Sequence, residues 1–418
     1  MPRDNLITGL DVGSTAIRVV VGHKERRGDR LKIIGAAEYP AQGISKGVVA
    51  GAEDAISSIS SVFERAERMI GQPISHAWVG ISGGHIVTLQ SRGAIAVSKT
   101  DGEIRPEDVE RVIEAARAVS TPPNYEVLHI IPKSFIVDSQ TGIKDPIGMT
   151  GFKLEVETQI IQGLSAQIKN LTKCIYRTSR DIDDLVMSIL ATSESVLTKR
   201  QKELGAVVIN LGGATTSIAV FEEDDLLHAA VLPVGSGLIS SDIALGLRVS
   251  IDTAEKIKLR EGSCLPKEFK KQDEMRFTEV GGIEEGSFSL KYVAEIIEAR
   301  TEEIFELVDK ELKKIGRSGM LPAGAILTGG GAKLKGITEV AKRTLRLPSS
   351  LGYPQELITS LEKVNDLSFT TAVGLVLWGA QLMERGGQSH FSGFAGKKFP
   401  GVDKAVGGIK NIFKSLFP

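Results

Sequence analysis

The chain has 418 residues, of which 42% are hydrophobic and 25% charged, and its formal net charge at pH 7 is −1. Such a composition is typical of a globular protein with two to four domains, and the near-zero charge argues against bulk electrostatic binding to nucleic acid. The two cysteines, Cys174 and Cys264, and the six scattered histidines show no disulfide or metal-ligand spacing, which favours a reducing cytosol.

The N-terminal region predicts a mixed α/β domain. Residues 6–39 form three runs of alternating apolar and polar side chains, which indicates a three-stranded meander with turns at Gly13 and near Gly28. Apolar residues then recur at helical spacing over 55–70, and a further strand is predicted at 74–83. The opening residues lack a basic segment followed by an apolar one, so no signal peptide is expected.

Residues 85–164 have a different character. A short helix is predicted at 106–119, among strand-like segments such as 126–138 and 152–163. This stretch has no phosphate-binding chemistry, and we interpret it as a small α+β unit inserted into the first domain.

From Gly205 the N-terminal order of strand, glycine-rich turn, strand, turn and strand begins again, which indicates a structural duplication. Residues 235–317 are mostly helical and end in a long amphipathic helix, and 323–345 predict a strand, a glycine-rich turn and a helix. The apolar run 372–383 is too short to span a bilayer and indicates a buried helix. After residue 385 the chain is rich in Gly and Ser without a period, which is typical of a flexible linker.

Two turns with glycine and hydroxyl residues, at 13–15 and 212–215, predict a phosphate-binding site. Each lies between two apolar strands and offers backbone N–H groups and hydroxyls without a bulky side chain in the way. Facing each other across a cleft, the two turns would clamp a triphosphate, and Asp11 would hold Mg²⁺ through water. The glycines at 329–331, between a strand and a helix, indicate another close approach of the backbone to a ligand.

These residues carry a resemblance to known proteins. The segments GLDVGSTAIRVVV, INLGGATTSIAVF and ILTGGGAKLKGI resemble the two phosphate motifs and the adenosine motif of the actin, Hsp70 and sugar-kinase superfamily. Within it, the IPxxxxVD…DPxGMxGxxLE pattern at 131–155 and the segment 242–262 most resemble FtsA, the family of bacterial cell-division actin homologues. The resemblance covers nearly the whole chain.

The resemblance implies an actin-like, two-lobed α/β ATPase fold with duplicated mixed-sheet domains, in which an inserted α+β subdomain replaces one subdomain of actin. It divides the chain into subdomain 1A (1–84, 165–200 and 368–387), inserted subdomain 1C (85–164), subdomain 2A (201–234 and 318–367), subdomain 2B (235–317), the flexible linker (388–403) and an amphipathic membrane-targeting helix (404–418).

The resemblance also implies ATP and Mg²⁺ as cofactors. The implied cofactor-binding residues are Asp11, Gly13, Ser14, Thr15, Asn210, Gly212, Gly213, Thr215, Gly235, Glu255, Lys258, Gly329, Gly330, Gly331 and Lys333. The residues of the two turns would contact the phosphates. Glu255 and Lys258 would contact the nucleoside, and the glycines at 329–331 would face the adenosine. Mg²⁺ would be held by Asp11 through water.

The second phosphate motif departs from the usual family pattern. Related sequences read DIGGGTTD where this chain reads NLGGATTS, so Asn210 replaces a carboxylate, Ala214 a glycine and Ser217 another acid. A metal-bound water loses one anionic partner, and we therefore expect ATP binding with slow or absent turnover, at most a weak ATPase. Alternatively, Asp11 suffices for the metal and the change at Asn210 is neutral.

The C-terminal residues 404–418 predict a short amphipathic helix. Its apolar face comprises Ile409, Ile412, Phe413, Leu416 and Phe417, and Lys410 and Lys414 lie on the flanks or opposite. After a flexible linker, this pattern is typical of a helix that lies in the membrane interface and binds anionic lipid. In the family this segment is the membrane-targeting helix. The alternative is a terminal helix that docks on its own body or on a partner protein.

The resemblance implies an ATP-binding cell-division protein at the division site, peripheral to the cytoplasmic face of the cell membrane. There it would polymerise into filaments, tether the tubulin-like division protein FtsZ and recruit later membrane proteins of the divisome. The C-terminal tail of FtsZ would bind at 235–317, where Arg300 and Glu303 are the candidate contacts. The alternatives are an actin-like pilus-assembly adaptor, a chaperone ATPase and a sugar-kinase-type phosphotransferase, which would need a carboxylate base in the cleft.

Overall fold

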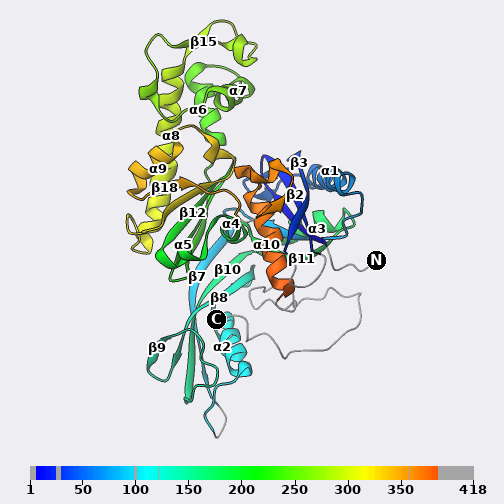
Figure 1. Ribbon diagram of the computed structural model, residues 1–418, viewed down its shortest axis with the longest axis vertical. Coiled ribbons are helices and arrows are strands. Elements are labelled where there is room, and N and C mark those ends of the chain that lie inside the picture. Colours follow the sequence, from blue (N-terminus) through cyan, green and yellow to red (C-terminus); the bar gives the residue numbers. More distant parts are fainter. Residues whose placement is uncertain (1–5, 25–29, 98–100, 121, 356, 385–418) are drawn as a thin grey trace.

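Three sheets organise the protein: one in each of two lobes, and a third in a subdomain that extends from the first lobe (Figure 1). The computed structural model describes residues 6–384 except 25–29, 98–100, 121 and 356. The predicted linker and membrane-targeting helix therefore lie outside the described residues. Within the described ranges, no helix is both long and apolar enough to cross a membrane.

The first lobe is built on a six-stranded sheet with the order β11-β6-β1-β2-β3-β19. Its strands are β1 (Leu6–Val12), β2 (Ala16–His23), β3 (Lys32–Pro40), β6 (His76–Ile81), β11 (Asp181–Met187) and β19 (Ile358–Thr359). The first three are antiparallel, which confirms the predicted meander, whereas β6 runs parallel to β1. The turn at 13–15 thus projects from the end of two central strands.

Helices α1 (Ala52–Ile70) and α3 (Ser165–Tyr176) pack against this sheet, and a small hairpin of β4 (Ile44–Ser45) and β5 (Val48–Val49) precedes α1. The predicted helix is therefore present. Its fully buried apolar side chains, three or four residues apart, are Ala55, Ile59, Val62, Phe63 and Ala66. Helix α1 ends at Gly71, which adopts the left-handed conformation with φ of 72°.

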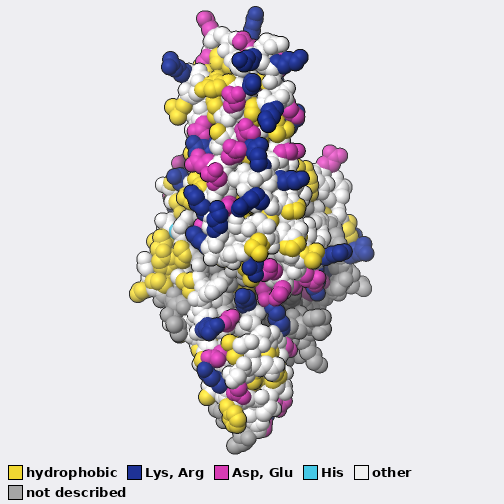
Figure 2. All heavy atoms as spheres, turned by 90° about the vertical axis from the view of Figure 1, so that its left-hand side faces the viewer, with side chains coloured by type: hydrophobic (Ala, Val, Ile, Leu, Met, Phe, Trp, Pro, Cys, Tyr) yellow, Lys and Arg dark blue, Asp and Glu magenta, His cyan; other side chains and the backbone are white. Residues whose placement is uncertain are grey.

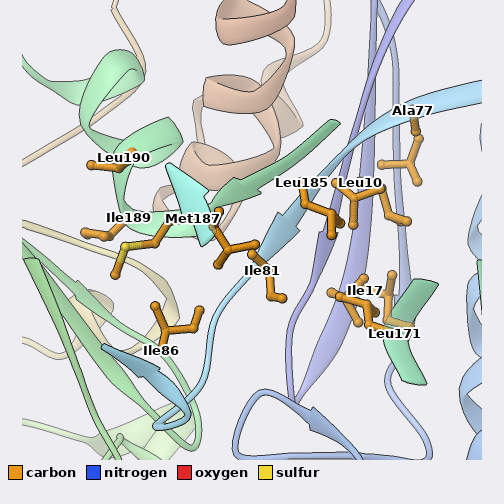
Figure 3. Close-up of a cluster of buried hydrophobic side chains, with 14 of the residues drawn as sticks. Leu10, Ile17, Ala77, Ile81, Ile86, Leu171, Leu185, Met187, Ile189 and Leu190 are labelled. Atoms are coloured by element: carbon orange, nitrogen blue, oxygen red, sulfur yellow. The ribbon is translucent and has the colours of Figure 1, made fainter. Parts of the chain in front are cut away.

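The core of the first lobe fixes the strands that carry the first turn (Figure 3). Leu10 of β1 and Leu185 of β11 each pair with Val79 of β6, the strand between them, and belong to the same buried cluster as Ile17 of β2 and Leu171 of α3. Burial of one such aliphatic side chain contributes about 1.5–3 kcal/mol. Because both strands flanking the turn are anchored in this way, the position of the turn is set by the core.

The inserted unit has its own four-stranded antiparallel sheet, ordered β7-β10-β8-β9, and one long helix. Its elements are β7 (Ile86–Ala96), α2 (Pro106–Ser120), β8 (Tyr125–Val137), β9 (Gln140–Ile143) and β10 (Lys153–Leu164). Helix α2 covers one face of the sheet, where Val109 and Val112 pack in a small core with Leu154 and Val156 (Figure 1).

The second lobe repeats the architecture of the first around a five-stranded sheet with the order β14-β13-β12-β17-β18. Its elements are α5 (Lys199–Leu204), β12 (Ala206–Leu211), β13 (Thr216–Glu222), β14 (Asp225–Leu232), β17 (Gly324–Thr328), η3 (Gly330–Lys333), α9 (Ile337–Leu345) and β18 (Ser349–Leu351). Strands β12, β13 and β14 form an antiparallel meander, and β17 runs parallel to β12 as β6 does to β1. The predicted duplication is thus visible in both sheets.

A mostly helical region extends the second lobe away from the inserted unit (Figure 1). Its elements are α6 (Gly237–Leu247), α7 (Ile251–Glu261), η1 (Pro266–Glu268), β15 (Glu274–Arg276), η2 (Phe277–Val280), β16 (Ser287–Ser289) and α8 (Leu290–Lys314). The long helix predicted here is α8, in which Ile304, Phe305, Val308 and Leu312 are buried, whereas Ile296 and Leu307 are half-buried. On the face in Figure 2, basic and acidic side chains are intermixed.

Two helices, α4 (Ser188–Val196) and α10 (Thr370–Glu384), cross between the lobes, with η4 (Glu362–Asn365) and η5 (Leu367–Phe369) before α10. They approach closely, since a Cβ placed on Gly374 would lie 1.8 Å from the carbonyl oxygen of Ala191. The side chains of Val373, Leu375 and Val376 are completely buried, which confirms the predicted buried helix.

Candidate functional site

A cleft of about 860 Å³ lies between the lobes, and almost all of the predicted cofactor-binding residues line it. These are Asp11, Gly13, Ser14, Thr15, Asn210, Gly212, Gly213, Thr215, Glu255, Lys258, Gly329, Gly330, Gly331 and Lys333. Gly235 is the exception: it does not line the cleft. We call this space the interlobe cleft.

The two glycine-rich turns face each other in the interlobe cleft. An ideal Cβ on Gly213 would lie 2.1 Å from the hydroxyl oxygen of Thr15, a distance that no real side chain adopts. Only glycine at this position lets the turn of the second lobe approach Thr15 without displacing it. Thr15 and Gly213 are 198 positions apart in the chain, and both line the interlobe cleft.

Backbone amides in both turns are available to a ligand. The second turn is closed by a hydrogen bond from the Gly212 amide to the Thr215 carbonyl at 2.9 Å, which leaves the amides of Gly213 and Ala214 inside the turn. Within the described residues, neither these amides nor those of Ser14 and Thr15 have a hydrogen-bond acceptor. Clustered N–H groups of this kind form an anion-binding concavity.

Gly235 supports the second turn from behind. A Cβ at this position would lie 2.7 Å from the carbonyl oxygens of Gly212 and Gly213. The next two amides hold the same turn, because Ser236 donates to the Gly212 carbonyl at 2.9 Å and Gly237 to the Gly213 carbonyl at 2.7 Å. Gly235 is therefore placed to position the second turn.

Three charged side chains form a row across β1, β2 and β3 at the edge of the cleft. Asp11 and Arg18 are cross-strand partners, and Arg18 is in turn opposite Glu38. The guanidinium Nε of Arg18 donates to Glu38 Oε2 at 3.1 Å. Burial raises the pKa of Asp11 to about 6, although the positive charge of Arg18 opposes this shift. A cation beside Asp11 would relieve that desolvation.

Asp11 suits a magnesium site in which the bound ligand supplies part of the metal coordination. Among the described residues, no three His, Cys, Asp or Glu side chains come together as a set of metal ligands. Mg²⁺ commonly keeps several waters and is bound through one or two carboxylates together with phosphate oxygens. One partly desolvated carboxylate beside two N–H-lined turns suits this mode of binding, in which the phosphates complete the coordination.

Asn210 has a structural role that its sequence position did not reveal. Its side-chain amide donates to the hydroxyl of Thr371 at 3.1 Å and lies 3.4 Å from that of Thr192, and the two hydroxyls are 2.9 Å apart. Thr192 belongs to α4 and Thr371 to α10, so this network connects β12 of the second lobe to both crossing helices. Asn210 thus lines the cleft and also contacts both crossing helices, and we call this junction of β12, α4 and α10 the hinge.

Two ion pairs and a glycine that faces open space also line the cleft. Lys258, only 8% exposed, is 2.7 Å from Glu255 and donates to the Ser236 carbonyl at 3.3 Å. Lys333 pairs with Asp366 at 2.6 Å. A Cβ on Gly330 would meet nothing within 4 Å, so the backbone here faces open space. This part of the cleft can accommodate a bulky polar group against polar walls.

The sequence did not single out several residues of the cleft. Arg18 and Lys363 both lie over the ring of Phe369, at 5.5 Å and 5.3 Å from its centroid, and all three line the cleft. The alternating pattern of the meander could have identified Arg18, because the register places it opposite Asp11. No local pattern links Lys363 and Phe369 to the turns.

The candidate contacts for a partner peptide lie outside the cleft. Arg300 of α8 binds both carboxylate oxygens of Asp242 on α6, at 2.6 Å and 2.9 Å, and also pairs with Glu303. The carboxylate of Asp242 raises the pKa of Arg300. Arg300 therefore already holds two helices together, while Glu303 is 54% exposed.

Comparison with known proteins places this geometry in a family. The chain matches the model described as "Cell division protein FtsA" over residues 207–374 and that of the "SHS2 domain inserted in FTSA" over 83–162. It is 35% identical to cell division protein FtsA of Pseudomonas aeruginosa, over 93% of this chain and 92% of that protein.

Two solved structures resemble the fold at low sequence identity. One is a PilM–PilN type IV pilus biogenesis complex, at 17% identity and a TM-score of 0.66, covering 91% of this chain and 99% of that chain. The other is MreB5 of Spiroplasma citri bound to AMPPNP, at 13% identity and a TM-score of 0.52, covering 92% and 97%. These similarities confirm the expected actin-like, two-lobed α/β fold.

Proposed function

Because the chain belongs to the FtsA family of cell-division proteins, we propose that it binds ATP with Mg²⁺ in the interlobe cleft and that nucleotide occupancy sets the shape in which its subunits polymerise. The filament would form on the inner face of the cell membrane at the division site. There the protein would tether FtsZ and recruit later membrane proteins of the divisome.

The observation that carries the nucleotide proposal is the contact between the two turns. Thr15 and Gly213 come from different lobes, yet both line the interlobe cleft. The amides of Ser14 and Gly213, which have no acceptor among the described residues, would then donate to one polyphosphate from two sides. A ligand held by both turns would fix the angle between the lobes.

Residues elsewhere in the cleft suit a nucleoside. The carboxylate of Glu255 can accept hydrogen bonds from ribose hydroxyls, and the ammonium of Lys258 lies beside it. The open backbone at Gly330 leaves room for a base. When bound, Mg²⁺ would neutralise phosphate charge, and Asp11 would orient a water in its coordination shell.

We propose little or no ATP turnover. The amide of Asn210 donates hydrogen bonds to the threonine hydroxyls of the hinge, so it offers no negative charge to a metal-bound water. Glu38 is paired with Arg18. Asp11 is then the carboxylate that remains for the metal, and nucleotide binding would act on shape more than on chemistry.

The membrane proposal rests on the sequence of 404–418, which lies outside the described residues. One helix with five apolar residues and two lysines binds a bilayer modestly, and polymerisation multiplies that binding by avidity. The test is sedimentation of the full chain and of a chain lacking 404–418 with vesicles containing anionic lipid, with and without ATP. Loss of pelleting on truncation is expected, whereas unchanged pelleting would refute the tether.

A further inference from the structure

The inserted subdomain touches the second lobe as well as the first, from which it extends. Strand β14, at the edge of the second-lobe sheet, lies against β7 of the insert (Figure 1). Two polar contacts join the insert to this strand. The side-chain nitrogen of Gln159 on β10 donates to the Leu227 carbonyl at 2.6 Å, and Lys144, which follows β9, pairs with Asp225 at the start of β14. We call these two contacts the brace.

The ion pair of the brace is largely shielded from water on its acidic side. The side chain of Asp225 is 18% exposed, and burial raises the pKa of its carboxyl although the charges of Lys144 and Lys133 oppose this shift. A shielded carboxylate depends on its cation more than one in an exposed ion pair does. The brace is therefore sensitive to the charge at position 144.

On the first lobe, His129 of β8 connects the insert to both crossing helices. This side chain is completely buried, and its Nε2 accepts a hydrogen bond from the Met187 amide at 2.9 Å. Met187 is the N-cap residue of α4, and the next residue, Ser188, lines the interlobe cleft. The His129 ring also lies edge-on to that of Trp378 on α10, with centroids 5.9 Å apart. The insert is thus anchored beside the helices that connect the lobes.

The brace and the close approach of the two phosphate turns occur in the same arrangement of the lobes. The brace joins the insert to β14, and Gly213, at the opposite end of the neighbouring strand pair, approaches Thr15 of the first lobe. A rotation of the lobes about the crossing helices would move Asp225 and Leu227 relative to His129. The brace therefore favours the angle at which both turns face one ligand.

We propose that the inserted subdomain regulates nucleotide binding in the interlobe cleft through the brace. The brace holds the lobes at the angle that a polyphosphate needs, so a larger fraction of chains is competent to bind and the apparent affinity for ATP rises. By linkage, ATP in the cleft stabilises the brace by the same factor. This inference rests on the proposed binding of ATP and adds a regulatory contact outside the cleft.

Calorimetric titration of the full chain with ATP and Mg²⁺ tests the proposal. Lys144→Glu turns the attraction to Asp225 into repulsion, and it should weaken ATP binding about fivefold or more, the lower end of typical couplings between sites. Adding Asp225→Lys reverses the ion pair and should restore the affinity. Lys153→Glu is the matched control, because Lys153 pairs with Glu155 inside the insert at 2.8 Å and should leave ATP binding unchanged. Lys144→Gln, which only removes the charge, should give a smaller loss.

Amide hydrogen exchange of the same proteins gives a second measurement. ATP should slow exchange in β14 of the unmodified chain but not in Lys144→Glu, and thermal unfolding shows whether each variant is folded. An unchanged ATP affinity in folded Lys144→Glu and Lys144→Gln variants would overturn the proposal, as would a failure of Asp225→Lys to restore binding. In both cases the unmodified chain still binds ATP. An unmodified chain that binds no ATP would instead refute the nucleotide proposal, and this inference with it.

Discussion

Asn210 donates a hydrogen bond to Thr371 at 3.1 Å, and this bond ties the central strand of the second lobe to the helix that crosses between the lobes. The residue that replaces an acid in the second phosphate motif is therefore a component of the hinge. The Asn210 amide donates hydrogen bonds to threonine hydroxyls, whereas a carboxylate at this position could only accept hydrogen bonds from them. Thr192 already donates to the Ser188 carbonyl at 2.8 Å, so it has no proton to offer an aspartate.

The first prediction concerns this substitution. Asn210→Asp should raise phosphate release above the slow or absent rate expected for the unmodified protein, because it adds an anionic partner for a metal-bound water. It should also lower the free energy of unfolding by about 1 kcal/mol, because the hydrogen bonds to the hinge are lost. Steady-state phosphate release and thermal unfolding measure the two effects.

Thr371→Val is the matched control for the hinge. It removes the same hydrogen bond without adding charge, so it should lower stability and leave phosphate release unchanged. Brisk release from the unmodified protein would contradict the proposed role of Asn210.

The second prediction concerns the contact of the turns. Gly213→Ala should lower the free energy of unfolding by about 1 kcal/mol, because the new methyl group forces Thr15 out of its rotamer. Combining it with Thr15→Ala should restore stability, since the Cβ atoms of the two residues would be 3.5 Å apart, an ordinary contact. Gly330→Ala, whose methyl group meets nothing, should leave stability unchanged. A double variant no more stable than Gly213→Ala would show that the turns do not touch.

The third prediction concerns pH and stability. The pKa of Asp11 is raised to about 6 from its ordinary value of 3.8, so the folded protein holds this proton more tightly than the unfolded chain does. The stability that this group contributes is fully present below about pH 4 and is lost as the pH rises through about 6. Asp11→Asn should therefore stabilise the nucleotide-free protein by up to about 3 kcal/mol near neutral pH, and by little near pH 4. Unfolding curves at the two pH values check this.

The same shift predicts how pH affects ligand binding. Affinity for ATP in the presence of Mg²⁺ should fall as the pH drops below about 6, because a protonated Asp11 cannot orient the metal-bound water. Affinity for ATP in the presence of a chelator should not show this fall. Identical pH profiles with and without Mg²⁺ would remove Asp11 from the metal site.

The fourth prediction distinguishes a structural role from a partner-binding role for two residues of α8. Arg300→Ala should lower the free energy of unfolding by about 1–2 kcal/mol, since it leaves Asp242 without its cation. Glu303→Ala should change stability little, because this side chain is exposed. If this surface receives the FtsZ tail, Glu303→Ala should weaken binding of a tail peptide in anisotropy measurements. Weakening by Arg300→Ala alone would point to a damaged fold instead.

Sequence patterns were sufficient to predict the helices, strands and turns, but not which residues distant in the chain contact one another. Alternation predicted the meander of β1 to β3, and the repeated glycine turns predicted that 13–15 and 212–215 would share a cleft. The partners of Asn210 could not be predicted, because Thr371 lies 161 positions away and meets it only where two helices cross.

The same limit applies to the charged residues around the cleft. Arg18 and Lys363 both lie over the ring of Phe369, and nothing in the local sequence of Lys363 or Phe369 marks them as neighbours of a phosphate turn. Gly235 was expected among the cofactor-binding residues, and it packs behind the second turn; the sequence signature of a glycine does not distinguish close packing from contact with a ligand.

Isothermal titration calorimetry of the purified full chain with ATP and Mg²⁺ tests the central claim most directly. We expect one binding event per chain, and Gly213→Val should abolish it because the larger side chain fills the space that Thr15 occupies. The absence of any heat of binding at millimolar ATP would contradict it.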